Sequence, residues 1–149
     1  MSPRGVAIPE VREQLFQAAE RVLLRDGPDG LTSRAITDEA GVAKGLLYNH
    51  FRDLDAFVAE LILDRTRAAA DEAARLPKSA GTGSVRGNLA GAASSLLGSD
   101  AFAIAGLVMF RPSLMARLHE AGAGHPFHAL DDIERAFAAY LEAEKALGR

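Results

Sequence analysis

A glycine between two short amphipathic segments, Gly41, constrains the fold of this 149-residue chain more than any other feature. Four apolar residues around it are spaced so that they can face one common core: Ile36, Ala40, Val42 and Leu47. Glycine readily adopts the left-handed backbone conformation that ends a helix and begins a tight turn. The spacing therefore predicts two short helices that meet at Gly41, the second running from about Ala43 to His50 or Phe51.

The residues on either side of this pair also predict helices. A first helix should begin near Pro9, where an apolar stripe of helical period starts, and end at the Gly27–Gly30 turn (Val11, Leu15, Ala18, Ala19, Val22 and Leu23). Thr32 or Ser33 can cap the next helix. Asp53 can cap a long helix that continues to about Leu76.

The second half of the chain predicts further helices after a loop at 77–84. Its apolar segments are Val85–Leu97, Phe102–Ala121 and roughly Phe127–Leu147. Pro112 should kink or split the middle segment, because proline cannot donate the helical hydrogen bond. No strand-like alternation of useful length occurs, so we expect an all-α fold.

Composition excludes several classes of protein. The chain has no Cys, which rules out disulfides, thiolate nucleophiles and Cys-ligated metals. No apolar run approaches the roughly 18–20 residues that span a bilayer, and the N-terminus does not resemble a signal peptide, so we expect a cytoplasmic protein. The net charge of −3 does not favour nucleic acid, and residues 31–52 carry only three Lys and Arg against two Asp and Glu.

The pattern of exposed residues is more informative than the charge. In a helix-turn-helix, a short helix supports a second one whose N-terminal part enters the major groove of DNA. The buried frame around Gly41 leaves six residues of the second helix free to face a groove: Ala43, Lys44, Gly45, Leu46, Tyr48 and Asn49. Lys44 can reach guanine O6 and N7, and Leu46 can contact a thymine methyl group.

From about Val11 to Phe57, and above all from Leu31 to Phe51, the sequence resembles the TetR family of bacterial transcriptional regulators. The resemblance implies an N-terminal three-helix helix-turn-helix domain at residues 1–53 and a helical ligand-binding and dimerisation domain at 54–149. It also implies that Ser33 and Arg34 touch phosphate or a base edge and that Lys44, Gly45 and Leu46 read bases. Tyr48 and His50 would hold the phosphate backbone, which orients the protein without specifying sequence.

Each of these residues also has a structural interpretation. Tyr48 can be a core aromatic of the three-helix bundle, and His50 can interact with the dipole at a helix C-terminus. Lys44 and Arg34 can be solvated surface charges. Their joint occurrence with Gly41 and its apolar frame favours DNA contact.

The sequence departs from the family pattern at two positions. Leu54, flanked by Asp53 and Asp55, stands where the family usually has a Lys that meets a phosphate. Its absence should weaken sequence-independent affinity and flatten the salt dependence, unless Arg52 substitutes. Thr37 replaces a common Ala in the supporting helix, which should crowd the helix crossing slightly.

The second half should bind a small, largely apolar effector and form a homodimer, as the resemblance implies. The candidate ligand-binding residues are Phe102, Leu107, Met109, Phe110, Met115, His119, Phe127 and His128. They can equally be ordinary core, because apolar residues at helical spacing usually are. His119, His125 and His128 lack a carboxylate or a fourth His at ligand spacing, so we expect no metal and no cofactor. Family members usually continue into two more helices that form the dimer interface, so we expect this chain to be truncated, incompletely represented or a shortened variant there.

These features favour a ligand-responsive, sequence-specific regulator that binds a palindromic operator in double-stranded DNA, most simply a repressor. The alternative is a helical interaction or adaptor module that retains the fold without specific DNA recognition. An enzyme is not expected, because the sequence has no recognisable catalytic triad, phosphate-binding glycine loop or metal-ligand cluster.

Overall fold

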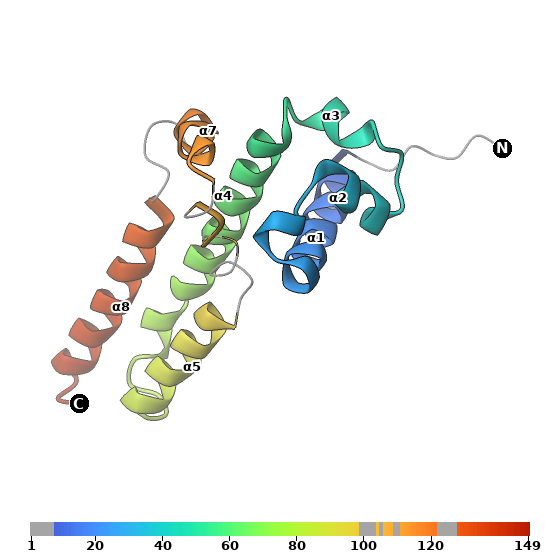
Figure 1. Ribbon diagram of the computed structural model, residues 1–149. Helices are drawn as coiled ribbons and strands as arrows, with labels where there is room; N and C mark the ends of the chain where they lie inside the picture. The colour runs from blue at the N-terminus through green and yellow to red at the C-terminus, as the bar shows by residue number, and fades with distance from the viewer. Residues whose placement is uncertain (1–7, 99–103, 105, 109–110, 122–127) are drawn as a thin grey trace.

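The computed structural model describes residues 8–98, 104, 106–108, 111–121 and 128–149. Every regular element within those ranges is a helix, as the sequence predicts. The first three α-helices lie together at one end of the molecule (Figure 1): α1 (Ile8–Asp26), α2 (Ser33–Ala40) and α3 (Leu46–His50).

A long helix, α4 (Leu54–Ala73), leads away from this end and carries the rest of the chain. The N-terminal part of α4 packs against α7 (Ser113–Ala121), which begins directly after Pro112. Further along, α4 packs against α8 (His128–Ala146) and touches α5 (Val85–Leu97). The predicted loop after α4 begins with a 3-10 helix, η2 (Leu76–Ser79), because Pro77 disfavours an α-helical continuation.

α1 places one apolar face at the centre of the core. The predicted stripe is confirmed: Val11 packs partly buried against the core, and the other members are buried (Leu15, Ala18, Ala19, Val22 and Leu23). After α1, Gly27 has a φ of 72° and leads into a short 3-10 helix, η1 (Pro28–Gly30). The glycine and proline run thus turns the chain back toward α2, as their backbone preferences require.

Local side-chain contacts set the start of α2 and of α4. The Thr32 hydroxyl accepts a hydrogen bond from the Ala35 amide at 3.1 Å, and the Asp53 carboxylate accepts one from the Ala56 amide at 2.7 Å. Both satisfy amides that the first helical turn leaves unpaired. Gly41 ends α2 with φ 69° and ψ 30°, which confirms the predicted left-handed turn.

α3 is shorter than the sequence predicts, and its expected start at Ala43 is wrong. The Leu46 amide donates to the Ala43 carbonyl at 2.9 Å, three residues back, so residues 43–46 form a turn before the α-helix begins at Leu46. Val42 reaches the core directly from the Gly41 turn, and the chain needs these residues to redirect itself into α3. Lys44 and Gly45 therefore precede α3 rather than lie within it.

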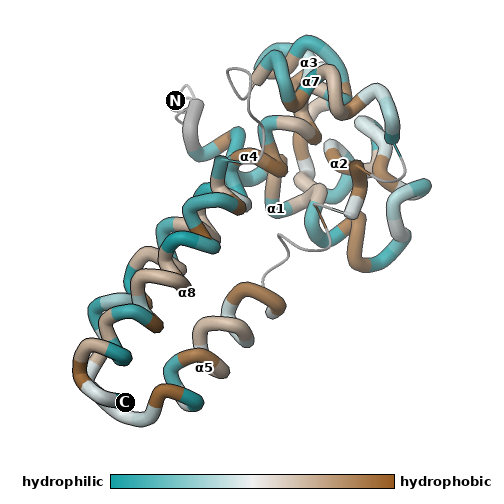
Figure 2. Tube along the Cα trace, turned by 90° about the vertical axis from the view of Figure 1, so that its left-hand side faces the viewer, coloured by the Kyte–Doolittle hydropathy of each residue, from teal (hydrophilic) through white to brown (hydrophobic). Residues whose placement is uncertain are grey.

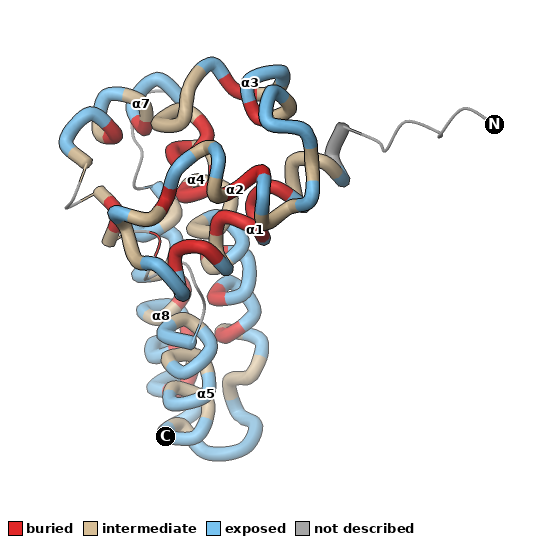
Figure 3. Tube along the Cα trace, turned by 45° about the vertical axis from the view of Figure 1, so that its right-hand side comes forward, coloured by how far each residue is buried: buried red, intermediate tan, exposed pale blue. Residues whose placement is uncertain are grey.

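The hydrophobic core runs from the first helices into the second half of the chain. Phe16, Phe51 and Phe57 form an aromatic cluster with ring centroids 4.9–6.0 Å apart. Four fully buried residues from the second half belong to the same core: Ile104, Leu107, Leu114 and Leu118. Figure 3 shows the buried residues gathered at the end of the molecule that holds α1, α2 and α7. Residues before and after the junction between α3 and α4 therefore share one hydrophobic core.

The far end of the molecule is packed more loosely. α5 contains no buried residue although most of its residues are apolar or small, and Figure 2 shows it standing apart from α8. α8 instead buries Tyr140 and Glu144 against η2 and the loop after it. The Glu144 carboxylate accepts a hydrogen bond from the Gly81 amide at 3.2 Å and lies 3.5 Å from Nε of Arg149. Burial and this carboxylate together raise the pKa of Tyr140.

Candidate nucleic-acid interface

The predicted frame of the helix-turn-helix is present in the structure. Ile36 and Leu47 are fully buried, and Ala40 and Val42 pack partly buried against the same core. The Val42 amide donates to the Thr37 carbonyl at 3.0 Å across the Gly41 turn, which closes the end of α2. The supporting helix and α3 are thereby joined through one glycine-centred turn.

The residues predicted to face DNA lie on the outside of this frame. Six of them are exposed: Arg34, Ala43, Lys44, Gly45, Tyr48 and Asn49. Three are half-buried: Ser33, Leu46 and His50. Tyr48 is 53% exposed, so the interpretation of Tyr48 as a core aromatic is wrong. His50 lies in the last turn of α3, where it can still interact with the helix dipole as well as with a phosphate.

A hydrogen bond joins the two helices on this surface. The Tyr48 hydroxyl donates to Oγ of Ser33 at 3.0 Å, so two of the residues predicted to hold the DNA backbone touch each other. Arg34 forms an exposed ion pair with Asp38 at 3.6 Å, one turn along α2. This carboxylate competes with a phosphate for the Arg34 guanidinium.

The Thr37 side chain, which replaces the common Ala, is buried with its hydroxyl hydrogen-bonded. Thr37 is fully buried, and its hydroxyl donates to the carbonyls of Ser33 and Arg34 at 3.0 and 3.1 Å within α2. The polar group thus finds partners in its own helix.

Leu54 packs half-buried against the core at the start of α4. The two carboxylates beside it are paired with residues of the second half. Arg117 donates to Asp53 at 2.7 Å, and Ser113 donates to Asp55 at 2.7 Å. The hydrogen bond from the Ala56 amide, together with the Arg117 charge, lowers the pKa of Asp53.

Sequence reasoning missed these partners from the second half. Arg111 also lies 3.4 Å from Asp55, and it donates to the Leu31 carbonyl at 2.7 Å. Between 56 and 80 positions of sequence separate these partners, and no local pattern connects residues that far apart. The sequence offered one signal of these contacts, the two carboxylates that flank Leu54. Two negative charges beside a surface proposed to meet phosphates would call for positively charged partners.

The predicted effector residues are only partly covered by the described ranges. Phe102, Met109, Phe110 and Phe127 lie outside them. Leu107 is fully buried in the core, and Met115 packs partly buried against it. His119 and His128 are exposed, and Nδ1 of His119 lies 2.8 Å from the Met115 carbonyl.

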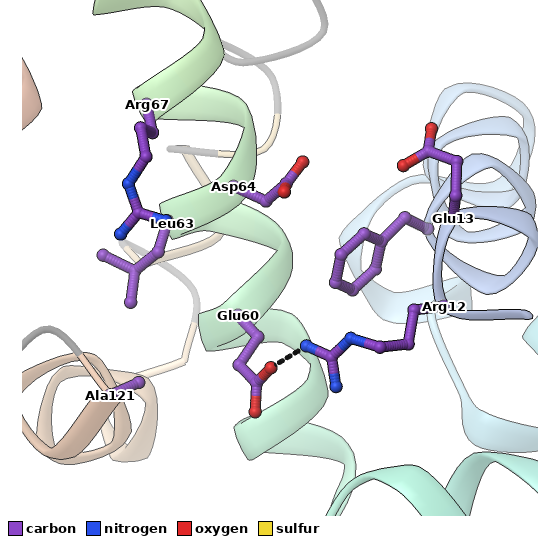
Figure 4. Close-up of a pocket in the computed structure, with 8 residues that line it drawn as sticks. Arg12, Glu13, Glu60, Leu63, Asp64, Arg67 and Ala121 are labelled. Atoms are coloured by element: carbon purple, nitrogen blue, oxygen red, sulfur yellow. Dashed lines mark hydrogen bonds and ion pairs between the residues drawn. The ribbon is translucent and has the colours of Figure 1, made fainter. Parts of the chain in front are cut away.

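A cavity of about 500 Å³ lies between α1 and α4, close to the end of α7 (Figure 4). Its lining is strongly charged and contains none of the predicted effector residues: Arg12, Glu13, Phe16, Glu60, Leu63, Asp64, Arg67 and Ala121. Arg12 and Glu60 form an ion pair across it, and the Arg12 guanidinium also lies over the Phe51 ring, 4.5 Å from its centroid. The cavity therefore sits against the contacts that hold α1 to α4.

Among the described residues, no group of His, Asp and Glu could hold a metal ion; His125 is not among them. None of the helices in the described ranges is long and apolar enough to cross a membrane.

Comparison with known proteins identifies the first part of the chain. Residues 15–61 match the model of a family described as bacterial regulatory proteins, tetR family. No curated protein and no solved structure matches the chain. Regulators of this family are DNA-binding proteins and not enzymes. The match spans α2, the Gly41 turn and α3, and so it includes the exposed surface described above. Residues 15–61 therefore belong to the tetR family, and this chain carries the DNA-binding domain of a transcriptional regulator.

Proposed function

We propose that the protein is a ligand-responsive repressor that binds a palindromic operator as a homodimer. The observation that carries the proposal is the exposed surface formed by the start of α2, the turn after Gly41 and α3. Lys44, Gly45 and Leu46, together with Ala43, would meet base edges in the major groove. Ser33, Arg34, Tyr48, Asn49 and His50 would hold the phosphates and fix the register.

Two copies are needed because one α3 is short. A helix of five residues covers few base pairs, whereas two copies that bind half-sites about 34 Å apart gain affinity and specificity together. In this proposal residues 1–53 bind DNA and residues 54–149 bind the effector and the second copy. The protein would act in the cytoplasm, where bacterial DNA is accessible.

An effector would release the operator by binding one arrangement of the two copies better than the other. The predicted apolar residues of the second half, from Leu107 to His128, are one place for it. The charged cavity between α1 and α4 is another, because a ligand there would act on the Arg12–Glu60 contact between those helices. A thermal-shift screen of small apolar and zwitterionic compounds would separate the two, since a ligand of the native state raises its stability.

Footprinting of the DNA beside the protein's own gene tests the proposal directly. We expect protection of a palindromic site with two half-sites one helical turn apart, and loss of protection when an effector is added. If the site is protected but no compound removes the protection, the protein is a DNA-binding regulator and the proposed response to an effector is wrong. A protein that protects no site and binds DNA with a shallow salt dependence would instead be a helical interaction module.

A further inference from the structure

The segment around the start of α7 reaches the DNA-binding end of the molecule through polar side chains. Arg111 donates to the Leu31 carbonyl at 2.7 Å, directly before the cap of α2. Arg111 and Ser113 both contact Asp55, and Arg117 contacts Asp53, at the start of α4. Figure 1 shows α7 beside the N-terminal part of α4, at the same end as α3.

The two carboxylates stand where a negative charge opposes DNA binding. Asp53 follows His50, the last residue of α3, by three positions, and Asp55 lies two positions further on. Phosphates held by α3 would pass close to both carboxylates, and the position between them is apolar Leu54. Like charges at this separation repel, so an unpaired Asp53 would weaken binding to every DNA sequence.

Both arginines are placed to offset this repulsion, because their side chains are partly withdrawn from solvent. The side chains of Arg111 and Arg117 are each only 22% exposed, which limits screening by salt. Leu114 and Leu118 are fully buried in the core and hold α7 in place beneath them. Arg117 also pairs with Glu120 at 2.9 Å, which fixes its guanidinium on the surface of α7.

We propose that Arg111 and Arg117 are positioning residues for DNA binding: they neutralise Asp55 and Asp53 and tie the start of α2 to the second half of the chain. The proposal rests on the proposed function, because it takes α2 and α3 as the DNA-binding surface. It assigns to α7 a role in sequence-independent affinity that Leu54 cannot supply. Neither arginine touches DNA in this scheme.

The test measures binding of fluorescent duplexes, one carrying the footprinted site and one of unrelated sequence, at several salt concentrations. We expect Arg117→Gln to weaken binding to both duplexes by about fivefold, because it leaves the Asp53 charge facing phosphate. Asp53→Asn keeps the helix cap, since Asn caps as well as Asp. In that background Arg117→Gln should have almost no further effect on affinity.

Arg111 gives a second, independent comparison. Arg111→Gln should weaken both duplexes similarly, and Asp55→Asn should restore only part of the loss, because the contact with the Leu31 carbonyl stays broken. Arg135→Gln is the matched control: it removes the same charge from an exposed pair with Asp132 on α8 and should leave affinity unchanged. Thermal unfolding of each variant establishes that it is folded at the temperature of the binding assay.

Several results would overturn the proposal. Equal affinity of Arg117→Gln and Arg135→Gln, with wild-type protein binding its site normally, would overturn this inference alone. Effects of Arg117→Gln and Asp53→Asn that simply add would show that Arg117 does not act through Asp53. A lowered unfolding temperature with unchanged affinity would leave both arginines purely structural. Wild-type protein that binds neither duplex would overturn the proposed function and this inference together.

Discussion

At the scale of single residues, the surface that we propose to bind DNA already carries contacts that DNA would have to share or replace. The Tyr48 hydroxyl donates to Ser33, and Arg34 pairs with Asp38. If DNA replaces such a bond with one to a phosphate, the number of hydrogen bonds stays the same. The new bond is stronger, because its acceptor oxygen is charged. Lys44 differs, because it is exposed and forms no ion pair within the described residues, so its side chain is free to reach the base that we propose it reads.

This difference predicts distinct effects for two substitutions on the same surface. Lys44→Ala should relax specificity at one base position, with a loss of about 1–3 kcal/mol for the preferred base. Tyr48→Phe should weaken all sequences similarly, because phosphate contacts carry no sequence information. Binding to the operator and to a set of single-base variants measures both. Ser33→Ala removes the same hydrogen bond from the other helix and should likewise weaken all sequences, because Ser33 is also proposed to hold a phosphate. Identical binding by Lys44→Ala, Tyr48→Phe and wild type would contradict these contact assignments.

At the scale of elements, two glycines of the helix-turn-helix have different roles. Gly41 has a φ of 69°, which side chains other than glycine adopt at a cost, although an added Cβ would meet no atom within 4 Å. Gly45 has a φ of −79° and equally open surroundings. Gly41 is therefore required by the backbone of the turn, whereas nothing in the folded chain requires glycine at position 45.

We expect Gly41→Ala to lower the free energy of unfolding by about 1 kcal/mol, the usual cost of a left-handed backbone conformation for alanine. Gly45→Ala should leave stability unchanged or raise it slightly, because alanine restricts the unfolded chain. It should nevertheless weaken DNA binding, because we propose that position 45 meets base edges and the added methyl group would stand on that exposed surface. Denaturant unfolding and duplex binding, measured on both variants, check the two expectations. A Gly45→Ala variant with wild-type affinity would show that the backbone at position 45 does not approach DNA closely.

At the scale of the whole molecule, ion pairs hold the DNA-binding end to α4. The Arg65 guanidinium on α4 binds Glu13 at 2.9 Å and Glu20 at 2.5 Å, both on α1. Its side chain is 18% exposed and lies over the Phe16 ring. The hydrogen bond from Arg65 lowers the pKa of Glu13 below its ordinary value of 4.5. The contact between Arg65 and Glu13 therefore stabilises the packing of α1 on α4 only while the Glu13 carboxylate is ionised.

This arrangement predicts a specific loss of stability in acid. Because the pKa of Glu13 is lower in the folded protein, its pair stabilises the fold fully above pH 4.5 and ceases to do so as the pH falls through the folded-state value. Glu13→Gln should reduce stability near neutral pH and flatten its decline below pH 4.5. Thermal unfolding from pH 3 to 7 measures this, and Glu134→Gln, which removes an exposed charge from α8, is the matched control. Parallel pH profiles for Glu13→Gln and wild type would contradict the linkage.

Much of the fold was predictable from the sequence because it depends on residues close together in the chain. Thr32 and Asp53 cap helices through amides three positions away, and Gly41 adopts the conformation that its missing side chain permits. The apolar stripe of α1 follows from helical geometry alone. The start of α3 was predicted three residues too early, because the burial of Val42 and the turn after it are set by the core and not by local preference.

The sequence by itself thus determined the order of the helices, the turn at Gly41 and the exposed residues around it that we propose to meet DNA. Only the tertiary structure decided how that face is supported. It paired Arg111 and Arg117 with the carboxylates at the start of α4, and it buried Glu144 against a loop far away in sequence. The reason is physical: caps, turns and helical stripes arise from contacts within a few residues, whereas ion pairs between distant helices form only where packing of the whole core brings them together.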